Sequence, residues 1–400
     1  MHEHPVQSFS ESHIKLILIA ILGLYPLVGM GIDLIAPSLP AISHELNASN
    51  HFSKNLITFY LLGYMLGNFL IGFLSDAIGR RQPMLLGFLI FMIVSILPVL
   101  FDKPIILLMV RFLQGLTLAA FAVSSRAVLS DILPKERLIR TTTLLATMWG
   151  IGPIIGPMIG GYLQFYFNWQ MCFYFFAFMG LIGLLSIIFI IPETHFHRQS
   201  LKYHQLKNNF LEIMTHSTFI GIVMLMGIVY SQLIVFNTLG PFLIQTFLGY
   251  SSIDFGKIAL LMGLTFLTGT FLCRYLLKKV YPEDIFLYAI PVFTLIAALG
   301  VLLALIFGNT IWVIIIPTVG MFLGCGIIYP TGMGKGLSLF RHLAGSAAAV
   351  MNLISISISS ITSFVMSFIH ADSALNIANI YFALMLLTIV VYYLFLRSKS

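Results

Sequence analysis

The segment Gly72-Phe73-Leu74-Ser75-Asp76-Ala77-Ile78-Gly79-Arg80-Arg81 is a short polar interruption between two long apolar stretches. It carries one acid and two adjacent arginines, and no segment close to it on either side is as polar. Charged groups are costly in hydrocarbon, so they collect where a chain leaves it. The segment is therefore predicted to be a loop at the edge of a nonpolar phase, between two membrane-spanning helices.

The composition of the 400 residues excludes a water-soluble protein. Hydrophobic residues make up 59% and charged residues only 9%, whereas soluble domains contain about 25% charged residues. Apolar windows of about 20 residues recur along the whole chain, and each is long enough to cross a hydrocarbon core of roughly 30 Å as a helix. The sequence therefore predicts an all-α membrane protein.

Polar breaks divide the chain into twelve predicted spans, and the longest break, 192–217, follows the sixth span. We interpret this break as a cytoplasmic linker between a six-helix bundle in residues 1–191 and a second one in residues 218–400. The predicted spans are 14–36, 53–74, 83–101, 104–130, 138–165, 170–191, 218–246, 253–278, 284–307, 310–333, 343–369 and 376–396.

The distribution of basic residues predicts the orientation in the membrane, because Lys and Arg accumulate in short loops on the cytoplasmic side. With the N-terminus inside, 17 of the 21 basic residues, Arg126 among them, fall at cytoplasmic ends and loops. Three fall outside, and Arg111 lies within a span. Both termini are therefore predicted to be cytoplasmic, and the net charge of +7 reflects topology rather than nucleic-acid binding.

The two halves show a weak internal repetition. Asp33 precedes Pro37 by four residues in the first span, and Asn237 precedes Pro241 by four in the seventh. Such repetition is expected when a transporter is built from two related bundles with its substrate site between them.

Three motifs and the end of the first span resemble a known family. Segment 72–81 resembles the loop 2-3 signature of the major facilitator superfamily, and Arg111-Phe-Leu-Gln114-Gly115 resembles its fourth-span motif. Gly152-Pro153-Ile-Ile-Gly156-Pro157-Met-Ile-Gly160-Gly161 resembles the fifth-span motif of drug:proton antiporters. With Asp33-Leu-Ile-Ala-Pro37-Ser-Leu-Pro40, the set resembles the bicyclomycin-resistance and MdfA-like multidrug exporters. The resemblance implies two pseudo-symmetric bundles and proton-coupled efflux by alternating access across a bacterial inner membrane.

Asp33 and Arg111 are the two costly charges inside spans. An intramembrane acid costs roughly 2.5 to 3.5 kcal/mol on insertion scales and is a functional candidate by default. Because burial disfavours a charged carboxyl group, we expect Asp33 to bind a proton from outside and release it inside, in alternation with substrate. The resemblance implies that Arg111 takes part in this coupling, through Gln114 or water. The alternatives are a solvated carboxylate at the outer mouth of the span and an arginine that reaches the outer interface.

The polar interruption is interpreted as a cytoplasmic gate rather than a substrate site. In the state closed to the inside, Asp76 can sit at the N-terminal end of the eleventh span, where unpaired N–H groups favour a negative charge. Arg80 can pair with Asp131 at the end of the fourth span. The alternative is that the arginines only enforce topology. The gate residues are Gly72, Asp76, Gly79, Arg80, Arg81 and Asp131.

Glycines recur at roughly four-residue intervals in the fifth span and predict a smooth face for close packing of a neighbouring helix, the eighth or eleventh span. Two prolines each remove one backbone N–H and are expected to kink this span. The resemblance implies that the face seals the cavity against a proton leak, and the alternative is packing alone. The motif residues are Gly152, Pro153, Gly156, Pro157, Gly160 and Gly161.

Polar, aromatic or soft side chains inside spans are candidates for the substrate cavity, although each can equally be a packing residue. Aromatic faces and methionines suit hydrophobic and cationic compounds. One departure matters: the MdfA type carries a second acid eight residues before Asp33, where this chain has Tyr25. Neutral or weakly charged cargo exchanged for one proton is therefore expected. The candidates are Tyr25, Tyr60, Tyr64, Gln114, Met148, Tyr230, Gln232 and Asn237.

Two other functions remain open: a dedicated exporter of one metabolite such as a siderophore, and an uptake symporter, which the glycine-proline face of the fifth span disfavours. The spans hold no catalytic or metal-ligand cluster, so neither an enzyme nor a metal site is expected. No phosphate-binding loop is present, so no cofactor and no ATP are expected. The predicted partners are a small-molecule substrate, protons and the lipid bilayer, and a monomer suffices.

Overall fold

The computed structural model describes residues 9–101, 103–194, 210–340 and 343–397. Twelve helices in these ranges are long and apolar enough to cross a membrane. Each corresponds to one predicted span, which confirms the predicted all-α membrane class.

The described residues of the first half form seven helices, of which α2 is too short to span a membrane, and a 3-10 turn. Their bounds are α1 Glu11–Asp33, the 3-10 turn Ala36–Ser38, α2 Leu39–Glu45, α3 Asn50–Ile78, α4 Arg81–Leu100, α5 Pro104–Ile132, α6 Lys135–Tyr166 and α7 Gln170–Phe189.

The second half contains six spanning helices. Their bounds are α9 Ser217–Pro241, continued by a π-helical turn Phe242–Phe247, then α10 Ser252–Leu276, α11 Pro282–Phe307, α12 Ile311–Leu339, α13 Ala344–Ser367 and α14 Ala374–Phe395.

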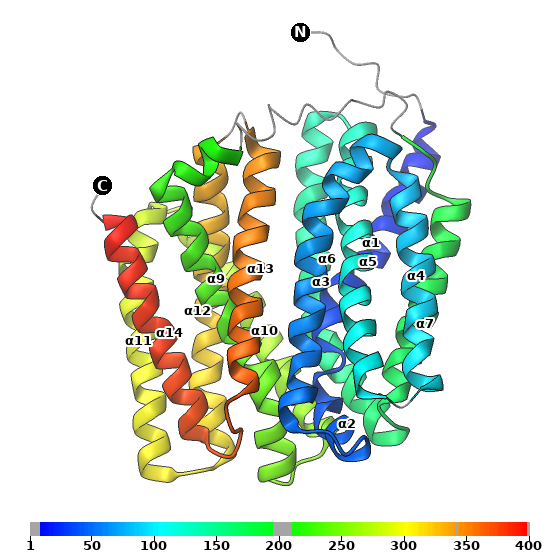
Figure 1. The fold of residues 1–400 in the computed structure, drawn as a ribbon. Coiled ribbons are helices and arrows are strands. Elements are labelled where there is room, and N and C mark those ends of the chain that lie inside the picture. Colours follow the sequence, from blue (N-terminus) through cyan, green and yellow to red (C-terminus); the bar gives the residue numbers. More distant parts are fainter. Residues whose placement is uncertain (1–8, 102, 195–209, 341–342, 398–400) are drawn as a thin grey trace.

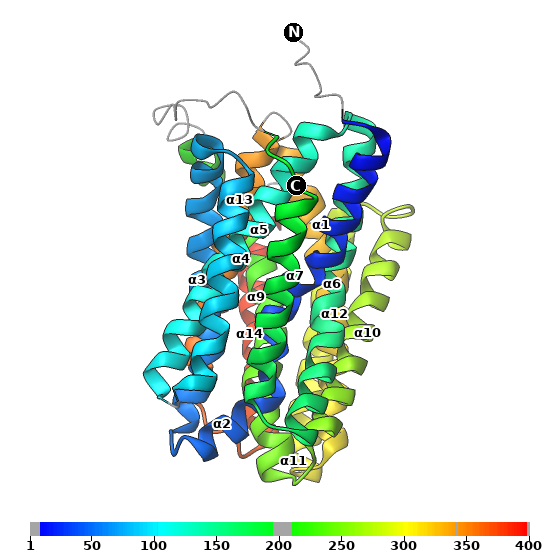
Figure 2. The ribbon, with the colours of Figure 1, turned by 90° about the vertical axis from the view of Figure 1, so that its right-hand side faces the viewer.

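The helices form two groups that run along one common direction (Figures 1 and 2). One group holds α1 to α7 and the other α9 to α14, and each has its own cluster of buried apolar side chains. The start of α1 and the end of α14 lie at the same end of the molecule, which we call the terminus end, and α2 lies at the far end (Figure 1). Most of the predicted linker, residues 195–209, lies outside the described residues.

The outer surface is apolar, as a lipid-facing surface requires. Large side chains such as Phe189, Leu295 and Leu394 are more than 60% exposed, whereas many polar side chains are buried between helices. This is the reverse of a soluble protein, where a large exposed apolar area marks an interaction surface.

Two boundaries differ from the prediction. The segment predicted to be a loop continues α3 to Ile78, and Gly79 ends the helix because its φ of +107° is accessible mainly to glycine. Only Gly79 and Arg80 join α3 to α4. Arg126, counted above among the cytoplasmic ends, lies inside α5, six residues before its end at Ile132.

Candidate functional site

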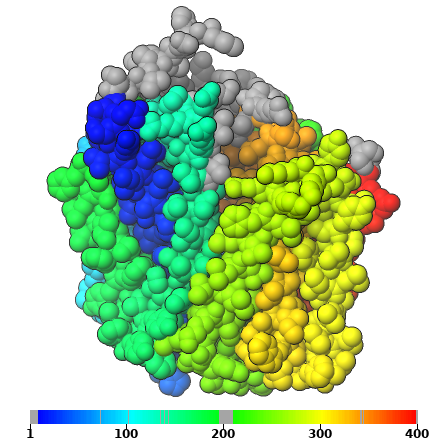
Figure 3. Space-filling model, turned by 180° about the vertical axis from the view of Figure 1, so that it is seen from behind, coloured from blue at the N-terminus to red at the C-terminus, as the bar shows by residue number. Residues whose placement is uncertain are grey.

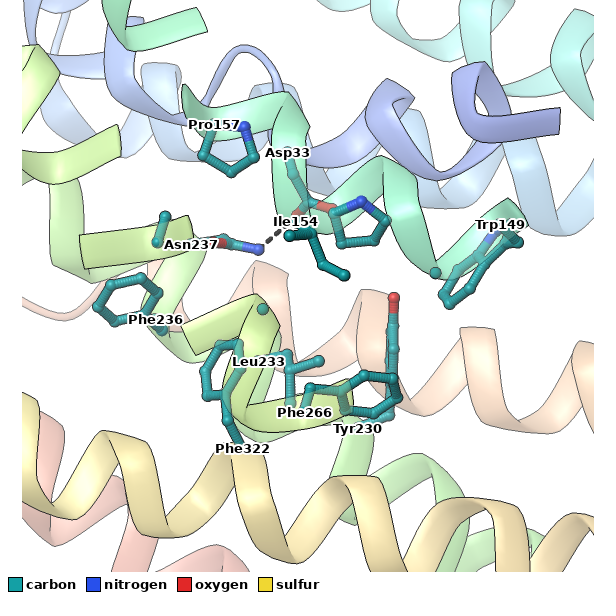
Figure 4. Close-up of a pocket in the computed structure, with 14 residues that line it drawn as sticks. Asp33, Trp149, Ile154, Pro157, Tyr230, Leu233, Phe236, Asn237, Phe266 and Phe322 are labelled. Atoms are coloured by element: carbon teal, nitrogen blue, oxygen red, sulfur yellow. Dashed lines mark hydrogen bonds between the residues drawn. The ribbon is translucent and has the colours of Figure 1, made fainter. Parts of the chain in front are cut away.

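Asp33 is the last residue of α1, and its side chain is only 3% exposed. Asn237 of α9 donates a hydrogen bond from Nδ2 to Asp33 Oδ1, so the contact joins the two halves (Figure 4). Asp33 lies four positions before Pro37, and Asn237 lies four positions before Pro241. A proline has no N–H, so it cannot donate the usual helical hydrogen bond to the carbonyl oxygen of Asp33 or Asn237. The regular helix ends close to both residues, which brings a carboxylate and an amide face to face.

A narrow cavity lies beside this pair, between the halves (Figure 4). Asp33 and Asn237 are polar groups at one side, and aromatic and aliphatic side chains make up most of the wall. A mostly apolar cavity with few placed polar groups is typical of a small-molecule site. Its other lining residues are Trp149, Gly150, Pro153, Ile154, Pro157, Tyr230, Leu233, Phe236, Ala259, Gly263, Phe266 and Phe322.

Arg111 is completely buried behind α1, so the alternative that it reaches the outer interface is wrong. Its guanidinium donates to Leu56 O at 3.2 Å, Gly31 O at 2.6 Å and Gln114 Oε1 at 3.0 Å. It also lies over the Tyr60 ring, 4.5 Å from the ring centroid. Arg111 therefore ties α5 and α3 to the backbone of α1 two residues before Asp33, and it does so without a direct contact to the carboxylate.

The glycine face of α6 packs mainly on α1. A Cβ on Gly152 would lie 2.4 Å from Pro26 O, and one on Gly160 would lie 1.8 Å from Leu34 O. Gly161 instead faces Ser252 of α10, whose hydroxyl donates to Gly161 O at 3.0 Å. Of the two expected neighbours, the eighth and the eleventh span, the eighth is met by one of these glycines. The first span, which carries Asp33, is the main partner of the glycine face, and the sequence did not predict it.

The predicted gate residues form a polar cluster at the terminus end. Arg80 makes ion pairs with Asp76 and, at 3.4 Å, with Asp131. Glu193, which the sequence analysis missed, accepts hydrogen bonds from the backbone N–H groups of Arg80 at 2.9 Å and Arg81 at 3.1 Å. These contacts all lie within the first half.

Several contacts join the halves at the far end. Lys54 Nζ donates to Ile369 O at 2.6 Å, and Gln245 Nε2 donates to Pro37 O at 2.9 Å. Seen from behind, α6 and α10 are in contact toward the far end and separate toward the terminus end (Figure 3). The structure is therefore closed at the far end, and the contact of Asp76 with the eleventh span, expected for the state closed to the inside, stays a prediction.

Three predicted cavity residues lie away from the narrow cavity in the structure. Tyr60 and Gln114 are completely buried beside the Arg111 guanidinium. Gln232 donates a hydrogen bond to Met385 Sδ at 2.9 Å inside the second half. Tyr230 and Asn237 line the cavity, whereas Met148 is neighbour to the lining residue Trp149, which was missed.

Tyr25 and Tyr64 do not line the narrow cavity, but Tyr64 interacts electrostatically with Tyr230. The missed lining residues are mostly apolar. The signal for Leu233 was its spacing from the two predicted residues, since Tyr230, Leu233 and Asn237 lie at i, i+3 and i+7 on one face of α9.

Known proteins resemble this chain in sequence and in fold. A bicyclomycin resistance protein homolog from Haemophilus influenzae is 24% identical over 393 residues, which cover 98% of both chains. The multidrug resistance protein MdtL from Shewanella oneidensis is 26% identical over 364 residues, or 90% of each chain. The crystal structure of a D-xylose-proton symporter has a TM-score of 0.79 at 14% identity, covering 97% of this chain and 99% of that one, which shows a shared fold. The family model described as Major Facilitator Superfamily matches residues 21–364, so the chain belongs to this superfamily of membrane transporters.

Proposed function

We propose that the chain is a proton-driven exporter of small amphiphilic compounds in a bacterial inner membrane, with both termini in the cytoplasm. The observation that carries this proposal is the position of Asp33. It is a buried carboxylate at the boundary between the halves, beside an apolar cavity and hydrogen-bonded to Asn237 of the other half.

Protonation of Asp33 changes what holds the halves together. A charged carboxylate accepts a strong hydrogen bond from the Asn237 amide, and a neutral carboxyl group accepts a weaker one. A proton on Asp33 therefore weakens the contact between the halves at this point. Because the cavity adjoins the pair, a bound substrate and a bound proton are expected to compete, which couples their opposite movements through a two-state equilibrium.

The fixed parts of the first half support this role. Arg111 holds the α1 backbone at Gly31, and the glycine face of α6 fits against α1 up to Leu34. Both contacts position the end of α1 on rigid helices, so Asp33 moves with the first half. The cavity then faces the cytoplasm when the far end is closed, and the predicted orientation makes this the loading state for export.

The names of two relatives favour export over uptake. One is a bicyclomycin resistance protein homolog and the other is the multidrug resistance protein MdtL. Export of many compounds or of one metabolite would both fit these names, and the substrate panel in the test below separates them.

Proton release from the purified protein in weak buffer tests the proposal. On addition of a panel of drugs and metabolites, the wild type is expected to release protons with those that bind, and Asp33→Asn is expected to bind without release. Accumulation of the same compounds in energised inside-out vesicles checks the direction. Equal release from both proteins would remove Asp33 from the mechanism, and uptake in the opposite direction would indicate a symporter.

A further inference from the structure

Arg126 is a cation inside the membrane-spanning part of α5. It lies six residues before the end of the helix, or about 9 Å at 1.5 Å per residue. Its Nε donates to Ala122 O at 2.9 Å, one turn back toward the far end. A helical side chain leans toward the N-terminus of its helix, so the guanidinium points toward the far end and away from the terminus end.

Arg126 forms no ion pair with any carboxylate among the residues that the structure describes. Arg111, by contrast, has three oxygen acceptors and is completely buried. Arg80 has two carboxylates. An arginine within a bundle is costly unless a partner compensates its charge, and such residues mark ligand or ion pathways. Within the described part of the chain, the one hydrogen bond of Arg126 goes to a backbone oxygen of its own helix, so its guanidinium has further donors to offer a ligand.

The surroundings of Arg126 connect it to the cavity. Its charge interacts with the phenol groups of Tyr25 in α1 and Tyr64 in α3. Tyr64 in turn interacts electrostatically with Tyr230 of the second half, a lining residue of the cavity that also interacts with Asp33. Tyr64 and Tyr230 therefore link the surroundings of Arg126 to those of Asp33, and the Tyr230 ring lies 6.3 Å from that of Trp149.

We propose that Arg126 binds an anionic group of the substrate, so that the exported compounds are amphiphilic acids with an aromatic or other apolar body. A carboxylate, sulfonate or acidic phenol would accept two parallel hydrogen bonds from the guanidinium, while its apolar body lies along the tyrosine rings toward Trp149. The same cation repels positively charged compounds, in agreement with the absence of a second acid at Tyr25. This inference rests on the proposed function only in taking the cavity as the substrate site.

Three compounds that share one naphthalene body test the charge preference: 2-naphthoate, the neutral 2-naphthamide and the cationic 2-naphthylmethylammonium. Binding to the purified protein is measured by calorimetry. We expect the wild type to bind the acid about tenfold to a hundredfold more tightly than the amide, as for one charge-assisted contact, and the cation least.

Arg126→Gln is expected to abolish the difference between acid and amide, and Arg126→Lys to retain part of it because the charge remains. Arg140→Gln is the matched control, since it removes one exposed cation of α6 near the same end. Elution as a single monodisperse species checks the folding of each variant, and Arg126→Lys keeps the test valid if Arg126→Gln does not fold.

Equal affinities of the wild type for acid and amide, or a preference that survives in Arg126→Gln, would overturn the inference, as would failure of all three compounds to bind. Proton release with the amide is measured in parallel for Asp33→Asn. If Asp33→Asn loses this release and the Arg126 variants bind acid and amide as the wild type does, the proposed function stands and this inference fails. If the preference for the acid depends on Arg126 but no protons are released, this inference stands and the proposed function fails.

Discussion

Arg111 shows how the bundle accommodates a buried charge. Each of its three hydrogen bonds ends on a different oxygen, and the oxygens belong to three helices, α1, α3 and α5. The planar guanidinium offers donors in several fixed directions, which a lysine ammonium on a flexible stem does not reproduce. The residue therefore acts as a fixed joint at the point where α1 approaches Asp33.

Arg111→Lys tests this geometry while keeping the charge. We expect a loss of about 2 to 3 kcal/mol, because at least one buried oxygen loses its charged donor. The thermal unfolding midpoint of the detergent-purified protein measures the effect. Arg137→Lys is the control, since Arg137 pairs with the exposed Glu11 and such surface pairs contribute about 0 to 1 kcal/mol. Equal midpoints for the two variants would show that the buried geometry contributes nothing.

Individual residues also show what sequence can and cannot predict. Asp33 and Arg111 stand out because a charge in an apolar run is rare and costly. In the structure, Asp33 lies buried at the boundary between the halves, and Arg111 lies buried in the core of the first half. Gln232 was predicted for the cavity on polarity alone, yet it faces Met385. The direction in which a polar side chain points within an all-apolar helix depends on its neighbours, and no periodicity in the chain marks it.

The contact between α1 and α6 is the closest helix pairing at the site. Gly152 and Gly160 leave no room for a Cβ next to the α1 backbone, whereas Gly23 of α1 has open space around it. The glycine spacing in the sequence predicted close packing correctly. It could not identify α1 as the partner, because a smooth face fits any helix that presents a complementary one.

Gly160→Ala is predicted to disturb this pairing. Its Cβ would lie 1.8 Å from Leu34 O, so the helices must separate, at a cost of about 1 to 3 kcal/mol typical of overpacking. Gly23→Ala adds the same methyl group where nothing lies within 4 Å and is expected to stabilise by about 0.5 to 1 kcal/mol through helix propensity. The unfolding midpoints should therefore shift in opposite directions. A rise in both would mean that α1 and α6 are not in close contact in the membrane.

The two halves meet mainly at the far end in this structure. The sequence predicted the six-plus-six division, since the longest polar break, 192–217, follows the sixth span. Contacts such as Lys54 with Ile369 were beyond it, because they join segments 315 residues apart.

Lys54 joins the two halves at the far end. Only 2% of the residue is exposed, Nζ donates to Ile369 O just beyond the end of α13, and the ammonium lies 5.3 Å from the centroid of the Phe242 ring. A cation at a helix C-terminus is favoured by the helix dipole. Lys54→Met keeps the length of the side chain and removes the charge, so it is expected to weaken the closed state by about 1.5 to 3 kcal/mol.

That loss shifts the equilibrium between the two states about tenfold to a hundredfold toward opening at the far end. Spin labels at the exposed His44 and Thr310, one in each half at the far end, report the change as a longer distance population by pulsed electron resonance. Lys257→Met removes an exposed lysine at the same end and should leave the distribution unchanged. An identical distribution in wild type and Lys54→Met would mean that the remaining contacts, such as Gln245 with Pro37, hold the far end closed without it.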